Sequence, residues 1–251
     1  MRVLLVAGNG LSLSMLNDCD EKEIDLLNLF RFGADVPWPA DGSPGFLSYE
    51  HCPNLWALGA RQNSTREESY AVIEKIITAV NACCMADPST LDDGIYIRAY
   101  KELVSYLRYL FVHYDDILND LGFFNKASGT PTVDAIQEIA TNKNVESLDV
   151  VTFNYDAMLE RCLQKERFEY SIPRLSENKS AQVSIHKPHG SITFCGNTSV
   201  DRSAFEINYA AQFTEGGLDD LCVRYESLSD NYPMVGMLPP LGSRIAISID
   251  G

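Results

Sequence analysis

The sequence lacks Cys-x-x-Cys pairs, long apolar runs and low-complexity tracts. Its 7 cysteines are odd in number and none is spaced two residues from another, so we expect reduced thiols, several of them buried, and no disulfide framework. No apolar run is long enough to span a bilayer, and the run Val3–Ala7 is too short for a signal-peptide core. These absences predict a cytoplasmic protein without membrane association.

Basic residues are also scarce. The chain has 20 Lys and Arg against 35 Asp and Glu, for a formal net charge of -15. Such a surface repels a phosphate backbone, so we expect no direct nucleic-acid binding. A single dinucleotide remains compatible with this charge, because backbone N–H groups at a helix N-terminus can hold its two phosphates.

What is present is typical of a globular protein: 251 residues, of which 45% are hydrophobic and 10% aromatic. The apolar run Val3–Ala7 predicts a first, central strand that is buried on both faces of a parallel sheet. Gly8-Asn9-Gly10 then breaks the extended pattern, and Ser12 and Ser14 are both candidate N-caps for a following helix. A strand, a glycine turn and a helix start form a phosphate-binding layout.

The next part of the chain predicts an insertion over about residues 35–130 of a single domain that spans residues 1–251. Pro and Gly residues punctuate 35–64 and predict a long loop or lid, in which Trp38 and Trp56 either pack or stack on a base. Apolar stripes then predict helices over Thr65–Met85 and Asp93–Leu118. Near the end of the second helix, Asp115 and Asp116 beside His113 suggest a solvated face.

Polar motifs follow two further predicted strands. A helix over Thr132–Ala140 precedes the strand Leu148–Phe153, after which come Asn154-Tyr155-Asp156 and a helical segment to about Gln164. The extended stretch Val183–Pro188 ends at His189-Gly190-Ser191. These patterns predict an α/β class: a Rossmann-like, mostly parallel sheet with helices on both faces. Ligands of such sheets bind outside the carboxyl ends of the strands, where the three motifs can converge.

The C-terminal part is less regular. Residues 233–240 predict a short strand that enters a rigid turn at Pro239-Pro240, and Arg244–Ile249 is a second strand candidate.

Taken in order, Gly8-Asn9-Gly10-Leu11-Ser12, Phe153-Asn154-Tyr155-Asp156 and Lys187-Pro188-His189-Gly190-Ser191 resemble the sirtuin-like NADase family of bacterial anti-phage effectors. Each motif alone is weak, whereas three in order after strand-like runs are more specific. The resemblance covers about Arg2–Ser191. It departs from the family at Asn9, where the family usually has Ala. It also departs in the last stretch of the chain, where relatives carry a further strand that holds the adenosine half of NAD⁺. That half is then held either by a longer chain or by a partner.

The resemblance implies an NAD⁺ glycohydrolase that releases nicotinamide and ADP-ribose in abortive infection. Relatives that deacylate proteins hold zinc through two Cys-x-x-Cys pairs, which are missing here, so hydrolysis is favoured and no metal is expected. NAD⁺ would be a substrate. The resemblance also implies a separate sensor or activator protein and a homo- or hetero-oligomer.

The resemblance and the chemistry of the motif residues together imply roles for nine positions of this chain. Asn154 would hold the attacking water or the ribose hydroxyls, Asp156 the nicotinamide carboxamide, and His189 would accept a proton beside the ribose. The residues expected to bind the dinucleotide are Gly8, Asn9, Gly10, Ser12, Gly190 and Ser191. Gly8 and Gly10 would let the backbone approach the pyrophosphate, to which Ser12 would donate.

Local structural roles would also account for these residues. The glycines could form only a tight turn, Asn154 could cap a helix that carries Asp156 in its first turn, and His189 could be a satisfied strand-end histidine. His186, inside the strand pattern, is assigned a structural role. Two other functions stay open: transfer of ADP-ribose or an acyl group to a protein, and a non-catalytic nucleotide sensor or scaffold.

Overall fold

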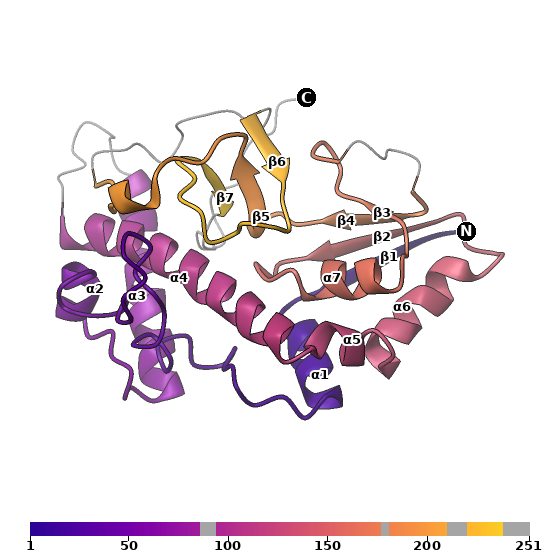
Figure 1. Cartoon of the computed structure of the whole chain (residues 1–251), viewed down its shortest axis with the longest axis horizontal. Coiled ribbons are helices and arrows are strands. Elements are labelled where there is room, and N and C mark those ends of the chain that lie inside the picture. The colour runs from indigo at the N-terminus through magenta and orange to yellow at the C-terminus, as the bar shows by residue number, and fades with distance from the viewer. Residues whose placement is uncertain (86–93, 177–180, 210–219, 238–251) are drawn as a thin grey trace. The chain divides into compact units, whose positions relative to one another are not determined.

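The computed structural model describes residues 1–85, 94–176, 181–209 and 220–237 (Figure 1). In chain order its elements are β1 (Arg2–Ala7), α1 (Asn9–Asp18), α2 (Pro53–Ala57), α3 (Arg66–Met85), α4 (Ile95–Asp120), α5 (Phe123–Ala127), α6 (Pro131–Thr141), β2 (Ser147–Thr152), α7 (Met158–Lys165), β3 (Tyr170–Ser171), β4 (Val183–His186), β5 (Gly190–Gly196), the 3-10 helix η2 (Arg202–Ala204), β6 (Leu221–Val223) and β7 (Val235–Met237). The predicted strand Arg244–Ile249 and the Pro239-Pro240 turn lie outside the described residues.

The main sheet has four parallel strands in the order β1-β2-β4-β3. In its register Ala7 lies beside Thr152, and Val151 lies beside His186, so β1, β2 and β4 end at the same edge. The predicted class is confirmed: an α/β, Rossmann-like fold that combines helices with a parallel four-stranded sheet. The three sequence motifs follow β1, β2 and β4 at that shared edge.

The core of this sheet lies on one face. There, side chains of β2 and β4 pack with those of α6 and α7, and Val3 and Leu5 of β1 lie against the cluster, which comprises Ile136, Ala140, Leu148, Val150, Leu159, Leu163, Val183 and Ile185. Side chains alternate along a strand, so Leu4 and Val6 point to the other face, where they are 64% and 60% exposed. The prediction that this strand is buried on both faces was therefore wrong.

The predicted central position of β1 was also wrong for the described residues, among which this strand lies at the edge of the sheet. The apolar run correctly indicated a strand, but a run of this kind does not reveal how many neighbours the strand has.

A second, antiparallel sheet has the order β6-β5-β7 and begins at the third motif. Its central strand β5 starts at Gly190, directly after His189, and was not predicted. The short strand expected within residues 233–240 is present as β7. The histidine motif thus joins the last long strand of the parallel sheet to the centre of the antiparallel one.

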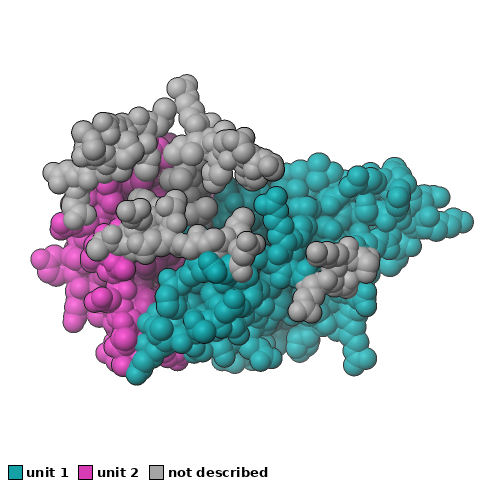
Figure 2. Space-filling model, turned by 90° about the horizontal axis from the view of Figure 1, so that it is seen from above, with its two compact units in different colours: residues 1–26, 111–201, 214–237 teal, residues 27–110, 202–213, 238–251 magenta. Residues whose placement is uncertain are grey.

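The chain divides into two compact units (Figure 2). The first contains residues 1–26, 111–201 and 214–237, and holds all three motifs; the second contains 27–110, 202–213 and 238–251. The second unit overlaps the insertion expected over about 35–130.

Helix α3 of the second unit begins where its sequence predicts. Thr65 Oγ1 accepts a hydrogen bond from Glu68 N (3.2 Å) and Glu68 Oε2 accepts one from Thr65 N (2.8 Å), which together form a capping box. In the segment before it, which contains α2, the Trp38 ring stacks on His51 at 3.9 Å and Arg61 lies over the Trp56 ring at 4.0 Å. Both tryptophans therefore have packing partners within this unit.

Of the two aspartates expected on a solvated face near the end of α4, only one is exposed. Asp116 is exposed, but Asp115 is buried and forms an ion pair with Arg161 of α7, with a second hydrogen bond from Arg161 Nε at 2.6 Å. Burial raises the pKa of the Asp115 carboxyl, and the Arg161 guanidinium opposes that rise. The periodicity of α4 does not reveal a partner that comes from another helix.

None of the helices in the described residues is long and apolar enough to cross a membrane.

Candidate functional site

The turn after β1 presents an uncapped helix N-terminus. Helix α1 begins at Asn9 with Gly8 as its N-cap, and no side chain caps it. The expected start at Ser12 or Ser14 was therefore wrong, since a glycine N-cap gives no side-chain signal in the sequence. The N–H groups of the first helical residues, Asn9 and Gly10, have no intrahelical acceptors, and the helix dipole places positive charge there.

Neither glycine of this turn is needed for internal packing. Gly8 has a φ of -125°, which other residues adopt. A Cβ added at Gly8 or at Gly10 would meet no atom of the described residues within 4 Å. The tight-turn explanation therefore does not account for these glycines. Asn9 is used internally in part, because its Nδ2 donates to Leu26 O at 3.1 Å.

A chain of hydrogen bonds joins the first two motifs. Ser12, buried inside α1, accepts from Asn154 Nδ2 (2.8 Å) and donates to Asp156 Oδ2 (2.8 Å). The second oxygen of this buried carboxylate, Asp156 Oδ1, accepts from Met158 N at 3.1 Å at the start of α7. The structure thus brings Ser12, Asn154 and Asp156 together. Asp156 is the residue that accepts a hydrogen bond from the start of α7, and Asn154 is not the N-cap of this helix.

His189 lies half-buried beside the same loop. Its ring centroid is 5.2 Å from that of Phe153 and 6.4 Å from that of Tyr155, the two residues that flank Asn154. Burial lowers the pKa of the His189 imidazole below its ordinary value. The ring is therefore neutral around pH 7 and able to accept a proton.

The two residues after His189 have structural roles. Gly190 has a φ of +80°, and a Cβ there would lie 1.7 Å from Gly236 O of β7, so no other residue fits. Ser191 is fully buried, and its hydroxyl donates to Tyr155 O at 3.2 Å. Both predicted binding residues are thus used to hold the motifs together.

Lys187 and Glu160, which were not predicted as site residues, are buried next to the loop that carries Asn154 and Asp156. Lys187 Nζ donates to Glu160 Oε1 (2.6 Å) and to Asp156 O (2.5 Å). Lys187 was visible in the third motif, but nothing in the local pattern of α7 indicates that Glu160 faces inward.

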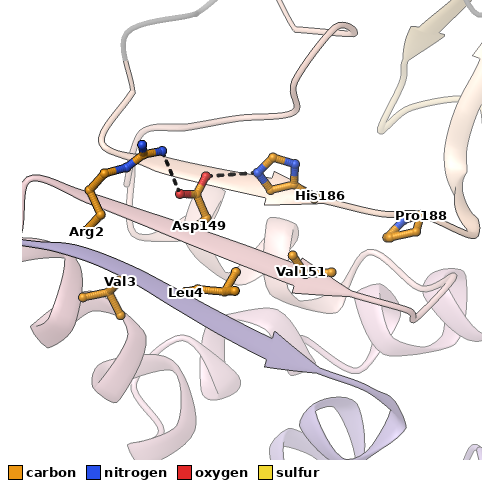
Figure 3. Close-up of a pocket in the computed structure, with 7 residues that line it drawn as sticks. All are labelled: Arg2, Val3, Leu4, Asp149, Val151, His186 and Pro188. Carbon is orange, nitrogen blue, oxygen red and sulfur yellow. Dashed lines mark hydrogen bonds and ion pairs between the residues drawn. The ribbon is translucent and has the colours of Figure 1, made fainter. Parts of the chain in front are cut away.

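The exposed face of the parallel sheet carries a groove that is separate from the three motifs' hydrogen-bond chain, and Figure 3 shows it. Its lining residues are Arg2, Val3, Leu4, Asp149, Val151, His186 and Pro188. Within it, Asp149 lies between His186 Nε2 at 3.1 Å and an Arg2 guanidinium nitrogen at 3.6 Å. The structural role expected for His186 agrees with this pairing.

Within the part of the chain that the structure describes, no three His, Cys, Asp or Glu side chains cluster as a metal site would require. The described cysteines are free thiols, and Cys52, Cys162 and Cys195 are buried.

The site therefore consists of an open, uncapped helix N-terminus, a Ser12-centred hydrogen-bond chain and a neutral histidine beside it. Comparison of the chain with protein-family models finds no matching family, and comparison with curated proteins finds no significant match.

Proposed function

We propose that this protein is an NAD⁺ glycohydrolase, which cleaves NAD⁺ and water to nicotinamide, ADP-ribose and a proton. One observation carries the proposal. Asn154 is hydrogen-bonded to Ser12 of α1, the helix that starts at the glycine turn. The rings of Phe153 and Tyr155, which flank Asn154, lie close to the ring of His189. An anion-binding group and a proton acceptor thus share one sheet edge, as a dinucleotide substrate requires.

The glycine turn is the proposed pyrophosphate site. The N–H groups of Asn9 and Gly10 would donate to phosphate oxygens, and the α1 dipole would favour their negative charge. Open space at Gly8 and Gly10 supports a close approach of the ligand to the backbone. Backbone donors suit an acidic protein, since they bind phosphates whatever the net charge.

Asn154 and His189 are the proposed catalytic residues. When the bond between ribose C1′ and the pyridinium nitrogen breaks, its electron pair goes to nicotinamide, which leaves neutral, so positioning and electrostatics dominate catalysis. The Asn154 NH₂ is directed to Ser12, so its carbonyl oxygen is the group proposed to orient the water or a ribose hydroxyl. His189 would take the proton of the attacking water.

The remaining predicted residues receive revised roles in this proposal. The Ser12 hydroxyl donates to Asp156, so it orients Asn154 instead of donating to phosphate. Asp156 anchors Ser12 and the start of α7, and its free lone pairs could still accept from the nicotinamide carboxamide. Gly190 and Ser191 support the loop from behind.

The proposal includes a biological setting that rests on the resemblance and, for the cytoplasmic location, on the features that the sequence lacks. The enzyme would act in the cytoplasm as an abortive-infection effector, without a metal ion, and would be switched on by a separate sensor protein or by oligomerisation.

The test is release of nicotinamide from NAD⁺ by the purified protein, alone and with the product of the neighbouring gene. We expect Asn154→Ala and His189→Ala each to lower turnover by about 100-fold or more, the effect of losing one transition-state contact. His186→Ala is the matched control: this histidine lies on the sheet face beside Asp149, so turnover should stay within about twofold.

Each other outcome selects a different function. Wild-type turnover in both Asn154→Ala and His189→Ala would reject this site. Label transferred from NAD⁺ to protein would indicate a transferase. Calorimetric binding of NAD⁺ without release of nicotinamide, even with the partner present, would indicate a sensor or scaffold.

A further inference from the structure

Lys187, the first residue of the third motif, is buried together with its counter-ion. The side chains of Lys187 and Glu160 are 0% and 1% exposed, and Nζ lies 2.6 Å from Oε1. Removing two charges from water is costly, and replacing such a pair with apolar residues of similar volume is often neutral or stabilising. Stabilisation of the fold therefore does not explain this ion pair well. The second hydrogen bond of Lys187, to a main-chain oxygen, suggests another role.

That second hydrogen bond joins Lys187 to the loop that carries Asn154. Lys187 Nζ donates to the main-chain oxygen of Asp156 at 2.5 Å. The neighbouring carbonyl, Tyr155 O, accepts from Ile192 N at 3.0 Å. Two consecutive carbonyls of the Asn154 loop are thus held by residues on either side of His189, and the loop cannot shift relative to His189 without breaking one of these bonds.

Glu160 in turn fixes the ammonium group. It extends from α7, the helix that begins immediately after the loop, so the pair also ties the first turn of α7 to the histidine segment. An ammonium group without this carboxylate would be a buried unpaired charge, which is strongly unfavourable.

We propose that Lys187 and Glu160 form a positioning pair that sets the distance between Asn154 and His189. This inference rests on the proposed function, because it concerns the same reaction. Neither residue needs to touch the substrate. Since the pyrophosphate would be held by the glycine turn, loss of the pair should lower kcat and leave the affinity for NAD⁺ nearly unchanged.

The test uses the double variant Lys187→Met/Glu160→Gln, which removes both charges together and leaves no buried ion unpaired. The matched control is Arg161→Met/Asp115→Asn, which neutralises the other ion pair of α7. Arg161 lies next to Glu160 in the sequence, but among the described residues its guanidinium donates to Asp115 and to Tyr225 O and not to the Asn154 loop.

We expect kcat of the Lys187→Met/Glu160→Gln protein to fall at least about tenfold, with KM for NAD⁺ within about twofold, as for a small misplacement of catalytic groups. The control should keep its kcat, and the melting temperature of both variants should stay close to that of the wild type. Equal kcat in wild type and the Lys187→Met/Glu160→Gln variant, or an equal loss in the control, would overturn the proposal.

Amide hydrogen exchange separates this inference from the proposed function. If the wild type releases no nicotinamide, the proposed function fails, whereas the positioning role still predicts faster exchange over residues 154–157 in the Lys187→Met/Glu160→Gln variant than in the control. Unchanged exchange in that segment would contradict the positioning role, whatever the activity of the wild type.

Discussion

Two turns of this protein follow parallel strands at the same sheet edge, and both contain glycines predicted to bind a dinucleotide. In the turn after β1, a Cβ at Gly8 or Gly10 would lie more than 4 Å from every atom of the part of the chain that the structure describes, whereas in the turn after β4 a Cβ at Gly190 would lie 1.7 Å from Gly236 O. The first turn has space beside its glycines and the second is closed by β7. The same residue type therefore leaves space beside the backbone in one turn, where we propose that the ligand binds, and permits close chain packing in the other.

Gly190→Ala should have the largest effect and tests the closed turn. The new Cβ would clash with the β7 backbone and would occupy a positive-φ conformation. We expect a loss of more than about 3 kcal/mol in the free energy of unfolding, measured by denaturant titration. A Gly190→Ala protein as stable as the wild type would show that the turn can accommodate a Cβ, and would contradict the claim that β7 closes it.

Gly10→Ala tests the open turn, with a smaller effect of a different kind. Ala has a higher helix propensity than Gly, so the free energy of unfolding should rise by about 0.5–1 kcal/mol. The added methyl group would occupy the proposed phosphate space, so the Kd for NAD⁺ should rise at least about tenfold, a cost of about 1.4 kcal/mol. Calorimetry measures the second quantity, and an unchanged Kd would show that phosphates do not approach Gly10.

The pH dependence of turnover should show the smallest effect. It also distinguishes the two turns, because Gly8-Asn9-Gly10 contains no titratable side chain, whereas the turn after β4 contains His189. Burial lowers the pKa of His189, and its neutral form is the proposed proton acceptor. Turnover should therefore be flat around pH 7–8 and fall only below the ordinary histidine value of about 6.5. A decline that starts above that value would indicate a different group.

The sequence predicted the elements around the site better than the contacts within it. Apolar runs located β1, β2 and β4, and the parallel topology then brought their motifs to one edge. The start of α1 was misplaced because serine is a strong N-cap residue and glycine leaves no comparable signal. Strand β5 was missed because Gly190-Ser191 was assigned to ligand binding.

The long-range pairs could not be predicted at all. Glu160 and Asp115 each lie on an amphipathic helix, where a charged residue ordinarily indicates a solvated face, yet both are buried against a cation from another segment. Such pairs depend on how helices pack, which residue spacing within one helix does not encode.

The central claim is that the glycine turn, Asn154 and His189 share one NAD⁺ site. Its most direct test is proton NMR of the four histidine rings, His51, His113, His186 and His189, during titration with NAD⁺. We predict that the Cε1 proton of His189 shifts in a saturable manner, while that of His186, three residues earlier on the sheet face, stays in place. A stationary His189 signal at saturating NAD⁺, or a shift of His186 in its stead, would contradict the account.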